Sequence, residues 1–316
     1  MPITIASIGE LLVEFVCEVK GGHHLQPARY LGPFPSGAPG IFIDQVARMG
    51  ARALFAGAVG DDAFGQVIRT RLVADGVDDR LIRTIPGEAT GSAFVSYNHD
   101  GSREFVFNIA RSAAAHFPDG AETAAAMLAA GVSLVHVSGS AFGDLSMRTR
   151  IADLVARLTA AGVALSLDPN VRREEMRDAG YLATLRDLVS RASLVLPSED
   201  DADLLFPGGA FASYAPRLIR GGARAVVLKR GAQGCIGMGT ELEAVAVAGQ
   251  TVTVVDPTGA GDCFCATFAA LFTMGMPLYQ ALVRANAAGA LAVQRLGPME
   301  GNSTPAEIDA FLERMR

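Results

Sequence analysis

The chain has 316 residues, with 27 Lys and Arg against 33 Asp and Glu, so its formal net charge at pH 7 is −6. An acidic chain with Lys20 and Lys229 as its only lysines is a poor candidate for nucleic-acid binding, which depends on many Lys and Arg contacts to phosphate. No segment matches G-x-x-x-x-G-K-[ST], which excludes a P-loop nucleotide enzyme. The length fits two domains or one large α/β domain.

Composition also bears on the compartment. The amino-terminal residues lack the basic start and continuous apolar core of a signal peptide. The most apolar stretch, residues 263–279, is shorter than the roughly 20 residues of a membrane-spanning helix. Cys17, Cys235, Cys263 and Cys265 are too few and too scattered for a disulfide framework. We therefore expect a cytoplasmic protein with neither a membrane nor a nucleic-acid partner.

In the amino-terminal half, apolar runs alternate with segments of helical periodicity. Strands are predicted at residues 3–9 and 52–60. Helices are predicted at residues 41–49 and 64–75, where apolar side chains recur every three or four positions. These elements fit one edge of an α/β sheet.

Residues 91–109 break this pattern, because polar and apolar side chains alternate around Asp100-Gly101, a hairpin turn signal. In this alternation Phe105 and Phe107 face one way and Asn108 faces the other. Together with residues 11–31, the hairpin could form a small sheet that projects from the main one. We therefore expect a β lid inserted in two pieces, residues 11–35 and 86–112, in a single domain spanning residues 1–316.

From residue 133 onward, apolar runs recur about every 30 residues, the length of one βα unit. The segments between them have helical spacing. Because the runs are continuously apolar, both faces of the resulting parallel sheet should be covered by helices. The predicted fold class is a three-layer α/β sandwich with a mostly parallel central sheet and a small β-sheet lid. The predicted strands are residues 133–139, 163–170, 193–198 and 225–231.

Ligands of an open parallel sheet bind beyond the carboxyl ends of its strands. The four strands just named end in turns of polar residues and glycine. Since these ends share one edge of the sheet, we expect a binding cleft there. The turns are Ser138-Gly139-Ser140, Asp168-Pro169-Asn170, Ser198-Glu199-Asp200-Asp201 and Lys229-Arg230-Gly231.

The clearest chemical signal is Asp-Pro-Thr-Gly-Ala-Gly-Asp at residues 256–262, followed directly by an apolar helix. Gly259, Ala260 and Gly261 present unobstructed backbone amides at the positive end of the helix dipole, where an anion such as phosphate binds. Asp262 then lies in the first turn, beside that anion. A carboxylate there either stabilises the helix start or serves as the base in phosphoryl transfer to a hydroxyl.

These residues resemble the PfkB family of ribokinase-like carbohydrate kinases, and the resemblance covers nearly the whole chain. Residues 256–262 resemble the family's carboxyl-side signature D-[TP]-T-G-A-G-D. Other matching segments follow in the family's order. They are residues 36–39, which resemble the amino-side signature that meets the sugar, residues 57–65, which match G-x-V-G-x-D-x-F-G, and residues 228–234 and 284–291, which resemble nucleotide-binding stretches.

The resemblance implies a ribokinase-like fold and an ATP-dependent sugar kinase. In that family pattern Asp262 is the general base for the substrate hydroxyl, and Gly259, Ala260 and Gly261 form the anion hole for the γ-phosphoryl group. ATP and Mg²⁺ are the implied cofactors, with Asp201 assisting the metal through water. The implied nucleotide-binding residues are Lys229, Gly231, Gly234, Thr258, Asn286 and Ser198.

The resemblance also assigns sugar contacts. It aligns Glu14 with an acid that hydrogen-bonds sugar hydroxyls, and Arg172 with an Arg of the fructokinase and ketodeoxygluconate kinase branches. Gly37 allows the sugar to approach the backbone closely. Asn108 is a further implied contact, and Asp262 touches the reacting hydroxyl.

The chain departs from the family pattern at two sugar positions. Ile41 replaces an Asn that usually hydrogen-bonds the sugar, and Asp44 or Gln45 could substitute for it. Ile109 replaces a lid Arg of the two branches, which disfavours an acidic sugar. The expected substrate is therefore an uncharged ketohexose resembling fructose or tagatose, with 2-keto-3-deoxygluconate or a nucleoside as alternatives.

A function of another class stays open, namely a non-catalytic regulator that binds a sugar or nucleotide. Ile41 favours it and the intact Asp262 argues against it. A nicotinamide dehydrogenase is disfavoured because the first strand ends in Gly9-Glu10-Leu11 and not in G-x-G-x-x-G. The two-piece lid suggests a homodimer through that sheet, as in the family.

Overall fold

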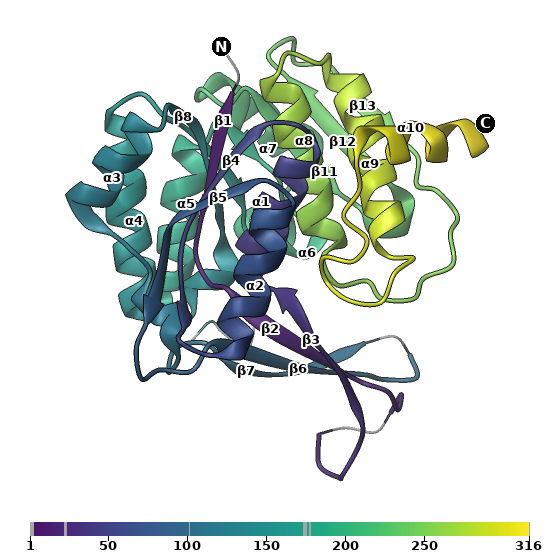
Figure 1. The fold of residues 1–316 in the computed structure, drawn as a ribbon. Coiled ribbons are helices and arrows are strands. Elements are labelled where there is room, and N and C mark those ends of the chain that lie inside the picture. Colours follow the sequence, from purple (N-terminus) through teal and green to yellow (C-terminus); the bar gives the residue numbers. More distant parts are fainter. Residues whose placement is uncertain (1–2, 22–23, 101, 173–175, 177, 316) are drawn as a thin grey trace.

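The computed structural model describes residues 3–21, 24–100, 102–172, 176 and 178–315. A large sheet runs through the middle of these residues (Figure 1). Its strands run parallel, except that the second strand from one edge is antiparallel to both of its neighbours. In spatial order they are β13 (Ala244–Val247), β12 (Cys235–Gly239), β11 (Ala225–Lys229), β10 (Leu194–Val195), β9 (Ala164–Asp168), β8 (Val132–Ser138), β1 (Thr4–Ile8), β4 (Arg52–Gly60) and β5 (Val77–Ile85).

The strands predicted from apolar runs are all present, and β10 is shorter than its run. Pro197 has no amide hydrogen for a ladder, so β10 ends at Val195. The chain regains contact with the sheet at Ser198, which forms a bridge with Lys229. This places Ser198 and Lys229 side by side at the carboxyl edge.

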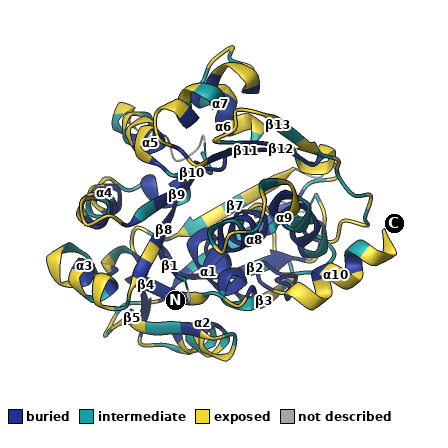
Figure 2. Ribbon diagram, turned by 90° about the horizontal axis from the view of Figure 1, so that it is seen from above, coloured by how far each residue is buried: buried dark blue, intermediate teal, exposed yellow. Residues whose placement is uncertain are grey.

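Helices cover both faces of the sheet, and each face has its own hydrophobic cluster, so the expected three layers are confirmed (Figure 2). One cluster joins the sheet to α1 (Ala38–Arg48), α2 (Ala63–Ala74), α8 (Ala260–Thr273), α9 (Leu278–Ala292) and α10 (Pro305–Arg314). The other joins it to α3 (Gly120–Ala129), α4 (Leu145–Ala160), α5 (Ala179–Arg191), α6 (Glu199–Leu205) and α7 (Phe211–Arg220).

A second, four-stranded sheet projects below the main sheet in Figure 1 and is called the lid here. Its order is β3 (Tyr30–Ser36), β2 (Leu12–Cys17), β6 (Gly91–Tyr97) and β7 (Arg103–Asn108). The predicted hairpin is β6 and β7, which pair antiparallel, although Gly101 of its turn lies outside the described residues. Its strands lie almost wholly within the expected segments 11–35 and 86–112.

Pairing in the lid separates two rows of side chains. Glu14 pairs with Ala93, which pairs with Phe107, and this row faces the main sheet. The next row, Phe15 and Phe94, extends to Val106 on the opposite face, where Val106 is 50% exposed.

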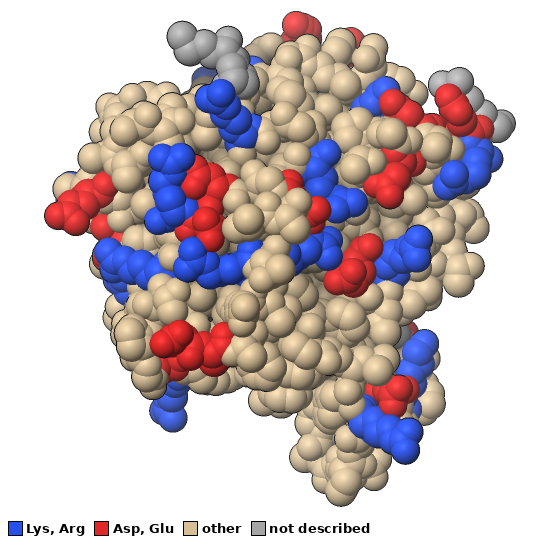
Figure 3. Space-filling view, in the orientation of Figure 1, with Lys and Arg blue, Asp and Glu red and all other residues tan. Residues whose placement is uncertain are grey.

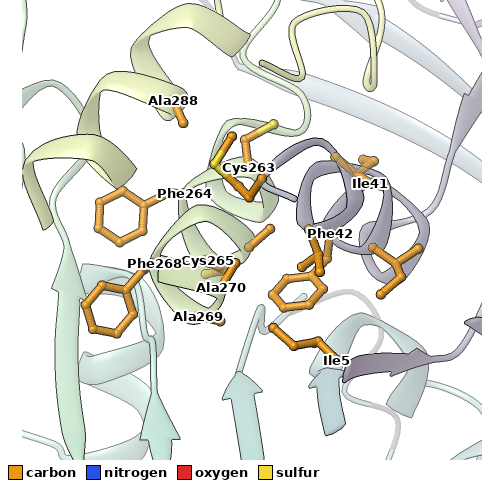
Figure 4. Close-up of a cluster of buried hydrophobic side chains, with 14 of the residues drawn as sticks. Ile5, Ile41, Phe42, Cys263, Phe264, Cys265, Phe268, Ala269, Ala270 and Ala288 are labelled. Atoms are coloured by element: carbon orange, nitrogen blue, oxygen red, sulfur yellow. The ribbon is translucent and has the colours of Figure 1, made fainter. Parts of the chain in front are cut away.

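Helix α8 is buried along most of its length between α1 and α9. Figure 4 shows Cys263, Cys265 and Phe268 of α8 in one buried hydrophobic cluster with Phe42 of α1. The cysteines therefore serve as small core residues, and all four in the chain are free and buried. This packing fixes α8, so its first turn is held firmly against the sheet edge.

The outer surface gives few further signals. None of the described helices is long and apolar enough to cross a membrane. On the face shown in Figure 3, acidic and basic side chains are interspersed.

Candidate active site

A cavity of about 760 Å³ lies between the carboxyl edge of the main sheet and the lid. Asp168 and Asn170 reach it from the end of β9, and Lys229 reaches it from the end of β11. Glu14 and Phe107 line it from the lid. The binding cleft expected at the strand ends is therefore present, and the lid forms its opposite wall.

The first turn of α8 forms one end of the cavity. Gly259 adopts a φ of 81°, and a Cβ there would lie 2.3 Å from the carbonyl oxygen of Pro298, so only glycine fits this close turn. The first full helical bond runs from the Cys263 amide to the Gly259 carbonyl oxygen at 2.8 Å. The amides of the preceding turn thus lack intrahelical acceptors, which suits them to bind an anion, although the Ala260 amide makes a long hydrogen bond of 3.5 Å to the Pro257 carbonyl oxygen.

Gly261 is exposed to the cavity. The nearest heavy atom to a Cβ built there is Lys229 Nζ, at 3.7 Å. An anion on these amides would therefore also meet the Lys229 ammonium group. Ala260 contributes to the turn through its backbone and does not line the cavity.

Asp262 lies next to this turn and lines the cavity. Its pKa is raised to about 8, mainly by burial and also by the Asp168 carboxylate, while Lys229 and Arg172 oppose the shift. A carboxyl with a pKa near neutrality both ionises and accepts a proton readily, as a general base requires.

Lys229 is held by a buried ion pair. Its Nζ lies 2.5 Å from Asp168 Oδ2, and Asp168 is only 2% exposed. Cys265 Sγ completes the group, at 3.4 Å from Lys229 Nζ and 3.3 Å from Asp168 Oδ2. Burial lowers the pKa of Lys229, but the Asp168 carboxylate outweighs this and the net shift is upward, so the ammonium stays charged.

On the nucleotide side, Ser198 and Asp201 form a capping box at the start of α6. Asp201 accepts hydrogen bonds from the Ser198 amide and hydroxyl and from the Val171 amide. Because Asp201 is 2% exposed and its carboxylate already accepts three hydrogen bonds, contact with a metal through water is favoured over direct contact. The neighbouring Asp200 is exposed and also lines the cavity.

These carboxylates fit Mg²⁺. The described residues contain no cluster of three or more side chains that could enclose a metal. Mg²⁺ keeps several waters and binds through one or two carboxylates plus substrate phosphates, so an open set of this kind suits it. Asp200, and Asp201 through water, are the groups that would hold it.

The other expected nucleotide residues divide into two groups. Gly231 and Thr258 line the cavity with Lys229 and Ser198. Gly234 and Asn286 do not line it. Gly234 adopts a φ of 89° in a turn where a Cβ would lie 2.1 Å from the Val247 carbonyl oxygen, and Asn286 donates to the Ala248 carbonyl oxygen at 2.9 Å.

On the lid side, Glu14 is 2% exposed and lines the cavity. Ser36 donates to its Oε2 at 3.3 Å, whereas its Oε1 is buried with no hydrogen-bond partner among the residues that the structure describes. The pKa of Glu14 is raised to about 7, mainly by burial and also by the Asp256 carboxylate. A buried carboxyl oxygen without a partner at the wall of a cavity is an acceptor for a ligand hydroxyl.

Gly37 sits next to Glu14 in the cavity wall and adopts a φ of 103°. A Cβ there would lie 2.6 Å from the Glu10 carbonyl oxygen, so the position is restricted to glycine. The expected close backbone approach is therefore available at Gly37.

Two arginines enter the cavity near the lid. Arg172 stacks over the rings of Phe107 and Phe105, at 4.6 and 5.7 Å from the ring centroids. Arg103 lies over Phe105 from β7, at 5.5 Å. Asn108, by contrast, is exposed on the other face of β7 and does not line the cavity. Its expected sugar contact is wrong because alternate residues of a strand face opposite ways.

A profile of the pfkB family of carbohydrate kinases matches residues 3–305 of the chain. The chain belongs to the pfkB family of carbohydrate kinases. Fructokinase-1 of Zea mays is 30% identical over 98% of both chains, and the fructokinase of Vibrio alginolyticus is 27% identical over 88% of this chain and 91% of its own. A crystal structure from E. coli, described as a candidate ribokinase II, superposes with a TM-score of 0.92 at 38% identity over 99% of both chains.

Within this pfkB kinase, the suggested replacements for the sugar-binding Asn are wrong. Asp44 is fully buried and accepts a hydrogen bond from Asn302 at 2.6 Å. Gln45 Nε2 donates hydrogen bonds to the Thr267 hydroxyl and to the Ser303 carbonyl oxygen. Both point away from the cavity, so Ile41 is the residue of this helix turn that lines it.

Several residues that line the cavity or hold its walls were not predicted from the sequence, among them Asp168, Arg103 and Tyr97. The sequence predicted Asp168 only as part of a turn. A carboxylate at the end of one strand and Lys229 at the end of another would have predicted their ion pair. Tyr97 and Arg103 gave no signal, because their role depends on where the hairpin lies. Tyr97 donates a hydrogen bond to Asp256, and Arg103 Nη1 donates to Thr258 Oγ1 at 3.3 Å.

Proposed function

We propose that this pfkB kinase transfers the γ-phosphoryl group of ATP to a hydroxyl of an uncharged ketohexose resembling fructose or tagatose. The observation that carries the proposal is the position of Asp262. It lies at once beside the anion-binding turn of α8 and in the cavity that the lid closes. Relatives named fructokinase match the chain from end to end and support the choice of acceptor.

ATP is the phosphoryl donor and a divalent metal accompanies it. The E. coli neighbour, 38% identical with a TM-score of 0.90, has been solved in complex with ATP and Mg²⁺. When bound, Mg²⁺ would bridge the phosphates and offset their charge. Lys229 Nζ, fixed by Asp168, adds a positive charge beside Gly261.

Asp262 removes the proton from the acceptor hydroxyl as its oxygen attacks the γ-phosphorus, and ADP leaves. The amides of the turn at Gly259 to Gly261 stabilise the negative charge on the transferred group. Glu14 accepts a hydrogen bond from another sugar hydroxyl through its unpartnered Oε1. The lid limits the access of water, which would otherwise compete with the sugar.

One observation favours a second acceptor class. Ile109 removes the family's lid Arg, but Arg103 brings a guanidinium group from the lid into the same cavity, opposite Arg172. Two arginines at the acceptor side would suit the carboxylate of an acid such as 2-keto-3-deoxygluconate. This alternative competes directly with the neutral ketohexose.

A screen of sugar-dependent ADP release decides between these acceptors. It compares ketohexoses, aldoses, polyols, 2-keto-3-deoxygluconate and nucleosides at fixed ATP and Mg²⁺. The proposal expects the highest kcat/KM with fructose or tagatose. A higher value for the acid would overturn the neutral acceptor, and no ADP release with any sugar would favour a non-catalytic regulator.

We further propose a homodimer formed through the lid, acting in the cytoplasm. The lid exposes apolar side chains on its outer face and tips, including Val106, Leu31, Leu25 and Val19. Sedimentation should give twice the chain mass of 32.9 kDa, and Val106→Asp should give the monomer while the equally exposed Val73→Asp should not. A monomeric wild-type protein would contradict this.

The free cysteines support a reducing compartment, which cell fractionation tests.

A further inference from the structure

The loop that leads into the anion-binding turn is held on one side by the body of the protein. Asp256 is fully buried and accepts two backbone hydrogen bonds. The Thr258 amide donates to Oδ1 at 2.9 Å, and the Gly297 amide donates to Oδ2 at 3.0 Å. Gly259 packs on the Pro298 carbonyl. These contacts fix the inner side of residues 256–259.

The other side of the same loop is held by the lid. The Tyr97 hydroxyl donates to Asp256 Oδ1 and lies 3.1 Å from Thr258 Oγ1. Arg103 Nη1 donates to Thr258 Oγ1 at 3.3 Å. Burial raises the pKa of Tyr97, so its hydroxyl keeps the proton that it donates.

Tyr97 and Arg103 are directly paired across β6 and β7, so a single rung of the hairpin makes both contacts. Farther along β7, Phe105 and Phe107 line the acceptor side of the cavity and stack on each other with centroids 5.0 Å apart. The hairpin of β6 and β7 thus connects the acceptor side of the cavity to the loop that leads into the anion-binding turn.

We propose that Tyr97 and Arg103 are positioning residues that set the anion hole through Asp256 and Thr258 when the lid lies over the acceptor. The proposal rests on the kinase function proposed above and adds to it a link between lid position and phosphoryl transfer. With the lid in place, the amides of Gly259 to Gly261 hold the geometry that stabilises the transferred group. Without that contact, ATP binds but neither sugar nor water receives the phosphoryl group efficiently.

Tyr97→Phe removes only the hydroxyl and is the sharpest test. Because a small displacement of catalytic groups costs up to about 100-fold in rate, we expect kcat to fall about 10- to 100-fold, with the KM values for ATP and sugar within threefold of wild type. Tyr30→Phe is the matched control, since Tyr30 is a lid tyrosine whose hydroxyl meets His24 and not this loop. A Tyr97→Phe kcat within fivefold of wild type, or a change confined to KM, would overturn the proposal.

A double-mutant cycle separates positioning from general destabilisation. If Tyr97 acts through Thr258, then Tyr97→Phe combined with Thr258→Val should be no worse than the more severe single variant. Losses that multiply would overturn the proposed path through Thr258.

Hydrogen exchange keeps the proposal testable even if no sugar substrate is found, because it needs neither ligand nor turnover. Peptides that contain residues 256–262 should exchange faster in Tyr97→Phe than in Tyr30→Phe and wild type. Equal exchange in all three would refute the proposal that Tyr97 positions this loop. An inactive wild type with faster exchange in Tyr97→Phe would instead refute the kinase function and support the positioning of the loop by Tyr97.

Discussion

The two ends of the cavity are built on different principles. At the α8 end, the proposed anion site consists of backbone amides in a turn fixed by Gly259, and the buried ion pair of Lys229 and Asp168 lies beside it. At the lid end, the wall is made of side chains from separate strands, including Glu14, Arg103 and Phe107. The first end depends on local geometry, and the second depends on how distant strands are placed.

This difference has a functional consequence. A backbone site cannot be altered by most substitutions, which suits a phosphoryl group that is common to all kinases of the family. A side-chain wall can change residue by residue, which suits an acceptor that varies among sugars. We therefore expect substitutions at the α8 end to affect turnover, and those at the lid wall to affect sugar affinity.

Asp262→Asn tests the α8 end most severely. Without a base the acceptor hydroxyl keeps its proton, and kcat should fall about 10²- to 10⁴-fold while the Kd for ATP changes little. Steady-state kinetics measure kcat, and calorimetric titration measures the Kd for ATP. Asp203→Asn, at an exposed position of α6, is the control. Near-normal turnover in Asp262→Asn would show that another group is the base.

Substitution of Gly261 probes the backbone site itself. Its Cβ position is open apart from Lys229 Nζ at 3.7 Å, so alanine fits the fold, and the two further methyl groups of valine would extend into the space expected for the phosphate. We expect kcat/KM for ATP to fall about 100-fold in Gly261→Val and less in Gly261→Ala. Wild-type kinetics in the valine variant would remove the anion hole from this turn.

Glu14→Gln probes the lid wall. Loss of the charged acceptor should raise the KM for the sugar about tenfold, since hydrogen bonds to charged groups are the stronger ones, and should leave the KM for ATP unchanged. Glu104→Gln, on the exposed part of β7, serves as the control. A change in the KM for ATP alone would contradict the division of the cavity into two ends.

The pH dependence gives the smallest and most specific effect. The base acts only when ionised, so kcat/KM should fall as the pH drops below the Asp262 pKa of about 8. The Asp168 carboxylate helps to raise that pKa, so in Asp168→Asn the acidic limb of the profile should move to lower pH, by up to about one unit. A shift to higher pH, or none, would assign the limb to another group.

The same contrast explains what the sequence could predict. Continuous apolar runs predicted the buried parallel strands, and Gly-Ala-Gly before an apolar helix predicted the start of α8. Both patterns could be read because they depend only on residues close together in the sequence. The edge strands β5 and β13 were missed, since edge strands are only partly buried and have weaker patterns. β12, which lies beside β13, was also missed, and it contains Gly237 and Gly239, a residue type that is depleted in strands.

The lid wall was harder to predict because its residues meet only after folding. Asp44 and Gln45 lie in α1, about one turn after the cavity residue Ile41, but their side chains hydrogen-bond to Asn302 and Ser303. Asn108 misses the cavity by one residue of strand alternation. Arg103 enters it because β7 passes over Thr258, a relationship between residues 155 positions apart.

The central claim is that this cavity transfers the γ-phosphoryl group of ATP to a sugar hydroxyl and not to water. Phosphorus NMR of a reaction with ATP, Mg²⁺ and either fructose or tagatose measures this directly. The account predicts one sugar monophosphate for each ADP formed, and little ADP when the sugar is omitted. ADP and inorganic phosphate formed at equal rates with and without the ketohexose, with no sugar phosphate, would contradict it.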